Sequence, residues 1–254
     1  MIGARVGFFL PQGFDPKSIS NLSVWFDASD ASTITLNGSA VSQWNDKSGN
    51  GLHASQSTAN NQPAYVTNDR NGLATVSFDG TNDSLVTSSF ANGWTTFTSF
   101  VVMRILGNAN IGLQIVWTRS TDRQRAIVAD TSNTAALPAY TMRGHLNSPA
   151  VNDFLCTNAY STANWKYITN RYDGTTSSRS AAFTGRLNGA AVTNTATGAI
   201  TTSSVANTVF RIGNRSDGTR GMNAKVGEML VYAASLSSAD VSSVESYLAK
   251  KWGF

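Results

Sequence analysis

The sequence lacks several features that would assign it to a class at once. Its single cysteine, Cys156, excludes a disulfide framework within the chain. Charged residues make up only 13% of its 254 residues, and a net charge of +4 spread this thinly does not indicate a nucleic-acid partner. No apolar run approaches the ~18 residues of a membrane-spanning helix, so we expect no membrane insertion.

A secretory signal is also missing from the N-terminal segment. In MIGARVGFFLPQG the apolar stretch VGFFL is shorter than the roughly 7–15 residues that such a signal needs. We therefore expect the protein to fold in a cytoplasm, without export through the general pathway. Residues 1–13 are expected to precede the domain as an arm, in which Phe8, Phe9 and Leu10 either dock on a partner or form a frayed terminus.

What the sequence does contain is a succession of short β-type runs, several of them alternating apolar and polar residues as half-buried antiparallel strands do. Turn dipeptides such as Asp79-Gly80 and Asn188-Gly189 end these runs, and Asn188-Gly189 predicts a hairpin. No repeat or linker divides the chain, so one domain is expected over 14–254. The clearest runs are 22–26, 74–78, 97–106, 111–117, 165–172, 181–187, 208–212 and 226–232.

One helix is predicted, at the C-terminus. In LSSADVSSVESYLAKKWGF, Ser237 and Asp240 have the spacing of a capping box, and an apolar stripe follows along one face. Lys250 and Lys251 suit the negative end of the helix dipole, and Gly253 suits its end. The stripe predicts that the helix packs on the outside of a β-sandwich.

These segments, in their order and spacing, resemble the laminin-G-like branch of the concanavalin A-like lectin/glucanase superfamily. The resemblance implies an all-β, two-sheet antiparallel jelly-roll sandwich, with the C-terminal α-helix packed outside. Members are carbohydrate-binding or adhesion modules on cell surfaces and phage virions, and some relatives are glycosidases. The matching segments include FDPKSISNLSVWFDASD (14–30), QWNDKSGNG (43–51), NGLATVSFDGTNDSL (71–85) and GEMLVYAASLSSADVSSVESYLAKKWG (227–253).

Glutamate is too scarce for the catalytic pattern of the superfamily's glucanases, which place two glutamates on one strand, with the carboxylates about 5 Å apart. The chain has only Glu228 and Glu245, and Glu245 lies in the predicted helix. Glu228 has no acidic partner on its own strand and is expected to pair with an arginine such as Arg211. No other nucleophilic motif is present, so we expect no catalytic residues and no enzymatic activity.

The stretch Asp46-x-Ser48-x-Asn50-Gly51 is similar to the opening of a calcium loop. An EF-hand is excluded, because its twelfth position would be Ser57. We favour a turn in which Trp44 packs inward and Asp46 accepts backbone hydrogen bonds. No cofactor is required on this interpretation. The alternative is a calcium site of lectin type at the rim of the sandwich, with Asp46, Asp79, Asp83 and Asp217 as its candidate ligands.

Exposed aromatic and basic residues are the candidates for carbohydrate binding, because flat rings stack on sugar faces. The aromatic candidates lie in or beside the middle of the chain, and the alternative for each is a place in the core. Arg123, within 119–125, and the run Arg211, Arg215 and Arg220 are candidates for contact with anionic glycans or an acidic protein, or else belong to solvated loops. The aromatic candidates are Trp94, Trp117, Tyr140 and Tyr160.

From these observations the first hypothesis is a non-enzymatic bacteriophage virion surface protein, a capsid decoration or fibre-type component. It would be made in the host cytoplasm, form a homo-oligomer and bind other virion proteins of the capsid or tail. The alternative is an extracellular carbohydrate-binding receptor or adhesion module, from a phage tail or a bacterial surface, that binds host-surface glycans with or without calcium. A glycoside hydrolase is disfavoured by the missing carboxylate pair.

Overall fold

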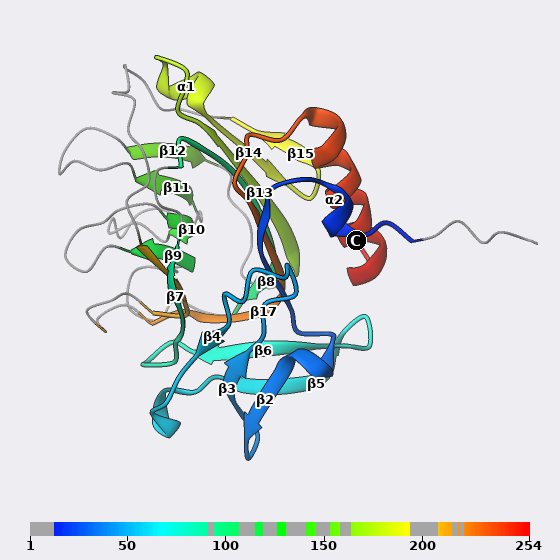
Figure 1. The fold of residues 1–254 in the computed structure, drawn as a ribbon, viewed down its shortest axis with the longest axis vertical. Helices are drawn as coiled ribbons and strands as arrows, with labels where there is room; N and C mark the ends of the chain where they lie inside the picture. Colours follow the sequence, from blue (N-terminus) through cyan, green and yellow to red (C-terminus); the bar gives the residue numbers. More distant parts are fainter. Residues whose placement is uncertain are drawn as a thin grey trace, which may run out of the picture.

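The computed structural model describes residues 13–90, 94–106, 115–118, 126–130, 141–145, 153–157, 164–193, 208–214, 218 and 221–254. Antiparallel strands make up most of this part of the chain, and they form two layers with the helix α2 (Ser238–Trp252) outside one of them (Figure 1). The predicted all-β sandwich with a C-terminal helix is therefore confirmed. No described helix has the length and apolar character needed to cross a membrane.

The first sheet is organised around β17, which pairs with β8 along one edge. Its other edge is shared, because the first half of β17 pairs with β6 and the second half with β1. Beyond β8 the sheet continues through β13 and β14 to β15, and Asn188-Gly189 forms the predicted hairpin turn with positive φ at both residues. The strands are β1 (Leu22–Asp27), β6 (Leu73–Asp79), β8 (Thr96–Ile105), β13 (Lys166–Asp173), β14 (Phe183–Leu187), β15 (Ala190–Val192) and β17 (Asn223–Tyr232).

The second sheet is organised around β16, which pairs with β7 on one side and β9 on the other. From β7 it continues to β4, β3 and β2, and from β9 to β10, β11 and β12. Strand β5 pairs mainly with β6 and meets β3 at one position, which joins the two layers. The strands are β2 (Ile34–Asn37), β3 (Ala40–Trp44), β4 (Ala54–Ser55), β5 (Ala64–Arg70), β7 (Leu85–Phe90), β9 (Ile115–Thr118), β10 (Ala126–Asp130), β11 (Thr141–His145), β12 (Asp153–Thr157) and β16 (Thr208–Ile212).

Every strand expected from the sequence has a counterpart, but several boundaries differ: β17 begins at Asn223 rather than at 226, and β9 is described only over Ile115–Thr118. The run expected over 181–187 begins as the short helix α1 (Arg179–Ala182), and β14 follows it. Single 3-10 turns also occur at η1 (Pro16–Ser18), η2 (Ala31–Thr33) and η3 (Ala59–Asn61). The division into an arm at 1–13 and a domain at 14–254 stays a prediction, because residues 1–12 lie outside the described part.

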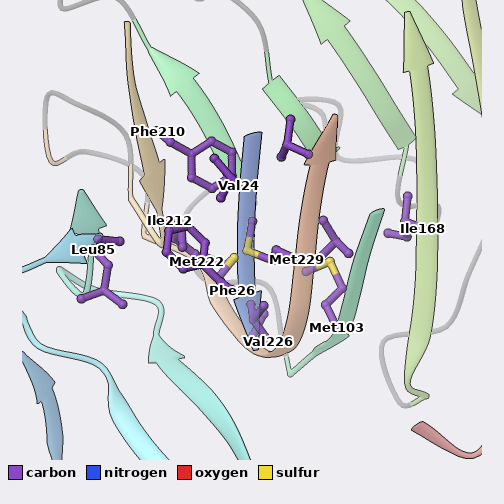
Figure 2. Packing of buried hydrophobic residues seen from close by; sticks show 14 of the residues in the cluster. Val24, Phe26, Leu85, Met103, Ile168, Phe210, Ile212, Met222, Val226 and Met229 are labelled. Atoms are coloured by element: carbon purple, nitrogen blue, oxygen red, sulfur yellow. The ribbon is translucent and has the colours of Figure 1, made fainter. Parts of the chain in front are cut away.

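The main hydrophobic core lies between the two sheets. Val24 and Phe26 of β1 point inward together with Met229 of β17, while Phe210 and Ile212 of β16 point toward them from the second sheet (Figure 2). The ring of Phe26 lies 6.2 Å from that of Phe210 and 5.4 Å from that of Trp44. Because side chains alternate along a strand, Trp25 and Asp27 of β1 face the opposite side, toward α2.

A second hydrophobic cluster holds α2 against the outer face of the first sheet. Val241, Val244 and Leu248 are buried there, as the apolar stripe predicted. The helix begins at the Ser237 cap, whose side chain accepts from the backbone N–H of Asp240, and ends at Gly253 with φ of 71°. Gly227 of β17 allows the close approach, because a Cβ atom there would lie 2.6 Å from the ring of Trp252.

Candidate functional site

The QWNDKSGNG stretch forms a turn built around Asp46, which is 8% exposed. One carboxylate oxygen of Asp46 accepts from the backbone N–H groups of Trp25 and Ser48, both at 2.9 Å. The other accepts from the backbone N–H of Leu52 at 3.2 Å and from the Ser48 hydroxyl at 2.7 Å. Positive φ at Gly49 and Gly51 and full burial of Trp44 match the expected turn. The carboxylate of Asp46 thus ties the turn to β1.

Replacing Asp46 with alanine is expected to lower the free energy of unfolding by about 2 kcal/mol, because buried backbone donors lose their acceptor. Urea unfolding measures this loss. The matched control is Asp30→Ala, since Asp30 also caps a turn through Ser32 but is more exposed; it should cost no more than about 1 kcal/mol. Calcium titration of both variants should match the parent protein. A calcium-binding signal that disappears only in Asp46→Ala would contradict this account.

Two of the other candidate calcium ligands, Asp79 and Asp83, lie at and just after the end of β6. Asp79 is exposed and accepts from the backbone N–H of Thr81 at 2.7 Å, whereas Asp83 is buried and accepts from the backbone N–H of Asp79 at 2.9 Å. Burial, with a further contribution from the Asp79 charge, raises the pKa of Asp83 to about 6. Asp217 lies outside the described residues. Among those described, no group of three or more His, Cys, Asp or Glu side chains could hold a metal ion, and calcium binding stays a prediction.

Of the aromatic candidates, only Trp94 has a described side chain. It is half-buried just before β8 and packs against the core between the sheets. The backbone of Trp117 lies in β9 opposite Phe210. The Trp117 ring and the candidates Tyr140, Tyr160, Arg123, Phe8, Phe9 and Leu10 lie outside the part that the structure describes.

A shallow pocket of about 280 Å³ opens beside α2, at the edge of the first sheet. Its lining brings together separate parts of the chain: the N-terminal segment before β1, β1 itself, the QWNDKSGNG turn and α2. This mixture of aromatic surface and a few charged groups is typical of small-molecule sites. The lining residues are Phe14, Asp15, Pro16, Lys17, Trp25, Lys47 and Tyr247.

Aromatic contacts shape this pocket. The ring of Phe14 packs on that of Tyr247 at 5.8 Å, and the Lys47 ammonium lies 4.5 Å from the centre of a Trp25 ring. Trp25 lines the pocket because the alternation of β1 turns it away from the main core, and only 7% of it is exposed. Lys17 is exposed at the rim, where its backbone N–H donates to the Asp15 carboxylate.

Beneath the pocket lies Glu228, which is fully buried. One of its carboxylate oxygens accepts from the Trp25 indole N–H and the Tyr247 hydroxyl, both at 2.8 Å. The other accepts from the Trp252 indole N–H and the Lys251 ammonium, also at 2.8 Å. Burial raises the pKa of Glu228, and the nearby Asp27 charge adds to the rise, while the Lys251 ammonium and the Trp252 indole oppose it.

Asp27 completes this network from β1, where it lies directly opposite Glu228. Lys251 bridges the two carboxylates, at 2.8 Å from each, and Lys47 lies 3.0 Å from Asp27 and 2.8 Å from Asp30. Burial raises the pKa of Asp27, but the Lys251 and Lys47 ammonium groups and the Ser29 side chain outweigh it, so the pKa is lowered overall. Glu228 therefore pairs with Lys251, and the expected pairing with Arg211 is wrong.

This network holds the pocket in shape rather than reaching a ligand. Both carboxylates are buried, and their donors come from the protein itself. Two lining residues, Trp25 and Tyr247, are fixed by their bonds to Glu228, and Lys47 is fixed by Asp27. From the sequence this network is not predicted, because Lys251 is given a role only at the negative end of the helix dipole. A signal was present, since Lys251 follows Leu248 by three residues and so lies near the buried stripe.

No protein-family model and no curated protein matches this chain, but solved structures share its fold. A Trypanosoma rangeli sialidase in complex with 2,3-difluorosialic acid is 12% identical, with a TM-score of 0.57 over 92% of this chain and 33% of that one. A GH54 α-L-arabinofuranosidase soaked with a cyclic sulfate inhibitor is 14% identical, with a TM-score of 0.62 over 84% and 51%. Domain 4 of AbnA, a GH43 extracellular arabinanase from Geobacillus stearothermophilus, in complex with arabinotriose, is 11% identical, with a TM-score of 0.58 over 89% and 98%.

These structures contradict the first hypothesis. They come from glycoside hydrolases, and none of the three comes from a virion. The prediction of a non-enzymatic bacteriophage virion surface protein is therefore wrong, and the same structures contradict the expectation of no enzymatic activity. The virion hypothesis depended on a missing secretory signal, but the residue at which a sequence starts does not show what precedes it. The chain spans about a third of the sialidase, half of the arabinofuranosidase and nearly all of the arabinanase domain.

Proposed function

We propose that this chain is a carbohydrate-recognition domain of a carbohydrate-active protein, and that it holds a saccharide in the pocket beside α2. The assignment to the laminin-G-like branch of its superfamily is part of the same proposal. One observation carries it: the pocket presents Phe14, Trp25 and Tyr247 from three different elements, beside the charged side chains of Lys17 and Lys47.

The chemistry of the pocket suits a sugar ring. A saccharide has apolar C–H faces that pack on aromatic rings and hydroxyl groups that bond to charged side chains at the rim. Lys17 and Asp15 supply donors and an acceptor there, and the pocket is small enough for one or two sugar units rather than a long chain. Support from the fold comes from the arabinanase domain, which was solved with arabinotriose.

A glycan array followed by calorimetry with arabinotriose and with the strongest array ligand tests the proposal. The double variant Phe14→Ala/Lys17→Ala removes one ring and one ammonium from the rim, and we expect affinity to fall about tenfold or more. The matched control is Phe254→Ala/Lys250→Ala, which removes an exposed phenylalanine and an exposed lysine outside the pocket lining. The control should bind like the parent protein.

Two results would count against this proposal in different ways. If no saccharide binds the parent protein, carbohydrate recognition itself is refuted. If a saccharide binds but both double variants bind it equally well, the pocket beside α2 is not the binding site.

A further inference from the structure

Arg211 lies on the outer face of the second sheet. Its neighbours on β16, Phe210 and Ile212, are fully buried in the core between the sheets. Because side chains alternate along a strand, Arg211 points the opposite way. The sequence predicted for Arg211 either a contact with an anionic partner or a place in a solvated loop. The loop alternative is wrong, because Arg211 is half-buried in a central strand.

The described residues around Arg211 do little to offset its positive charge. Its cross-strand partners are Val86 on β7 and Val116 on β9. The guanidinium Nε is buried and has no hydrogen-bond partner among the residues that the structure describes. Burial lowers the pKa of Arg211, and among the described residues no carboxylate counteracts this. Buried cations are normally paired, so Arg211 carries a charge that an anion would stabilise.

Three other described arginines have partners. Arg186 forms an ion pair with Glu245 at 2.9 Å, Arg171 donates to the Ser235 hydroxyl at 2.6 Å, and Arg70 donates to the Trp252 carbonyl at 2.7 Å. Among the described residues Arg104 of β8 also has a buried Nε without a partner, and its cross-strand position is taken by Lys225, a second cation, which is paired with Asp69. Arg211 differs from all of these, because valines occupy both of its cross-strand positions.

Small hydroxyl side chains lie close to Arg211 on the same face. Ser55 of β4 lies opposite Val86, and Ser89 of β7 lies opposite Val209, which shares the outward direction of Arg211. Both serines are exposed. One cation beside serine hydroxyls and the side chain of Val86 can hold an oxyanion and its neighbouring hydroxyl groups.

We infer that Arg211 is the anion-binding residue of a second saccharide position, on the outer face of the second sheet, which takes the carboxylate or sulfate group of an acidic saccharide. The choice of a saccharide as ligand rests on the proposed function; the choice of an anion rests on Arg211 alone. A guanidinium bonds such groups through paired N–H donors, which gives charge-assisted hydrogen bonds.

Calorimetry at low salt with three matched probes tests this inference: an oligogalacturonide, its neutral methyl ester and a heparin-derived oligosaccharide. We expect the parent protein to bind at least one acidic probe about tenfold more tightly than the ester. Arg211→Gln should abolish that preference, and Arg104→Gln, its matched control on the other sheet, should keep it. The oligogalacturonide carries carboxylates alone and the heparin probe carries sulfates as well, so tight binding of the heparin probe alone would identify sulfate as the required group.

Thermal unfolding shows whether the variants are folded. Since Arg211 is half-buried without a counter-charge, Arg211→Gln should melt no lower than the parent protein. Equal binding of the acidic probes and the ester by the parent protein would overturn this inference alone, and so would loss of the preference in Arg104→Gln. Failure of all three probes and of arabinotriose to bind would refute the proposed function together with it.

Discussion

Replacing Glu228 with alanine is expected to lower the free energy of unfolding by about 3–5 kcal/mol, the cost of breaking a buried ion pair from one side. Glu228 is fully buried and accepts from Trp25, Tyr247, Lys251 and Trp252. Alanine would leave the donors of Trp25, Tyr247 and Trp252 without their acceptor beneath α2, and Lys251 would keep only Asp27. Urea unfolding followed by far-UV circular dichroism measures the loss.

The matched control is alanine at Glu245, the only other glutamate of the chain. Glu245 is also buried, but its partner Arg186 has a side chain that is 36% exposed and can return to water. We expect Glu245→Ala to cost about 1–3 kcal/mol, less than Glu228→Ala. A Glu228→Ala variant that loses less than about 1 kcal/mol would show that the network does not hold the helix.

Replacing Trp44 with alanine is expected to cost about 3–5 kcal/mol, because it leaves a cavity in the core between the sheets. Trp44 is fully buried and packs against Phe26. Its indole N–H is buried and has no hydrogen-bond partner in the described part of the chain, so Trp44→Phe removes an unsatisfied donor while it keeps an aromatic ring. We therefore expect Trp44→Phe to recover most of the loss.

Trp252→Phe is the matched comparison for this second variant. The indole N–H of Trp252 donates to Glu228 at 2.8 Å, so phenylalanine removes a bond there rather than an unsatisfied group. Denaturant unfolding should rank Trp252→Phe as more destabilising than Trp44→Phe. The reverse order would contradict the contrast between the two indoles.

Much of the fold could be predicted because its determinants are local. The capping box at Ser237 and the turn at Asn188-Gly189 each depend on a few neighbouring residues, and both are present. Sheet order depends on pairings between distant segments, such as β1 with β17, and no local pattern specifies them. The sequence does not predict the strands between residues 34 and 70, because they are short or lack a clear alternation of apolar and polar residues.

The site was largely unpredictable for the same reason. The aromatic residues of the pocket come from positions as far apart as Phe14 and Tyr247. The sequence around each of them indicates only a residue of the hydrophobic core. The sequence candidates were sought in the middle of the chain instead, where the family resemblance is weakest. The link between Trp25 and Glu228 spans 203 positions and arises only when β1 and β17 pair.

The central claim is that the pocket beside α2 binds a saccharide, and a backbone amide NMR titration tests it most directly. The labelled protein would be titrated with arabinotriose and with the strongest neutral ligand from a glycan array. We predict saturable shift changes at the amides of Asp15, Lys17, Lys47 and Tyr247, which line the pocket. Saturable changes confined to other parts of the chain, or no change with either saccharide, would contradict this account.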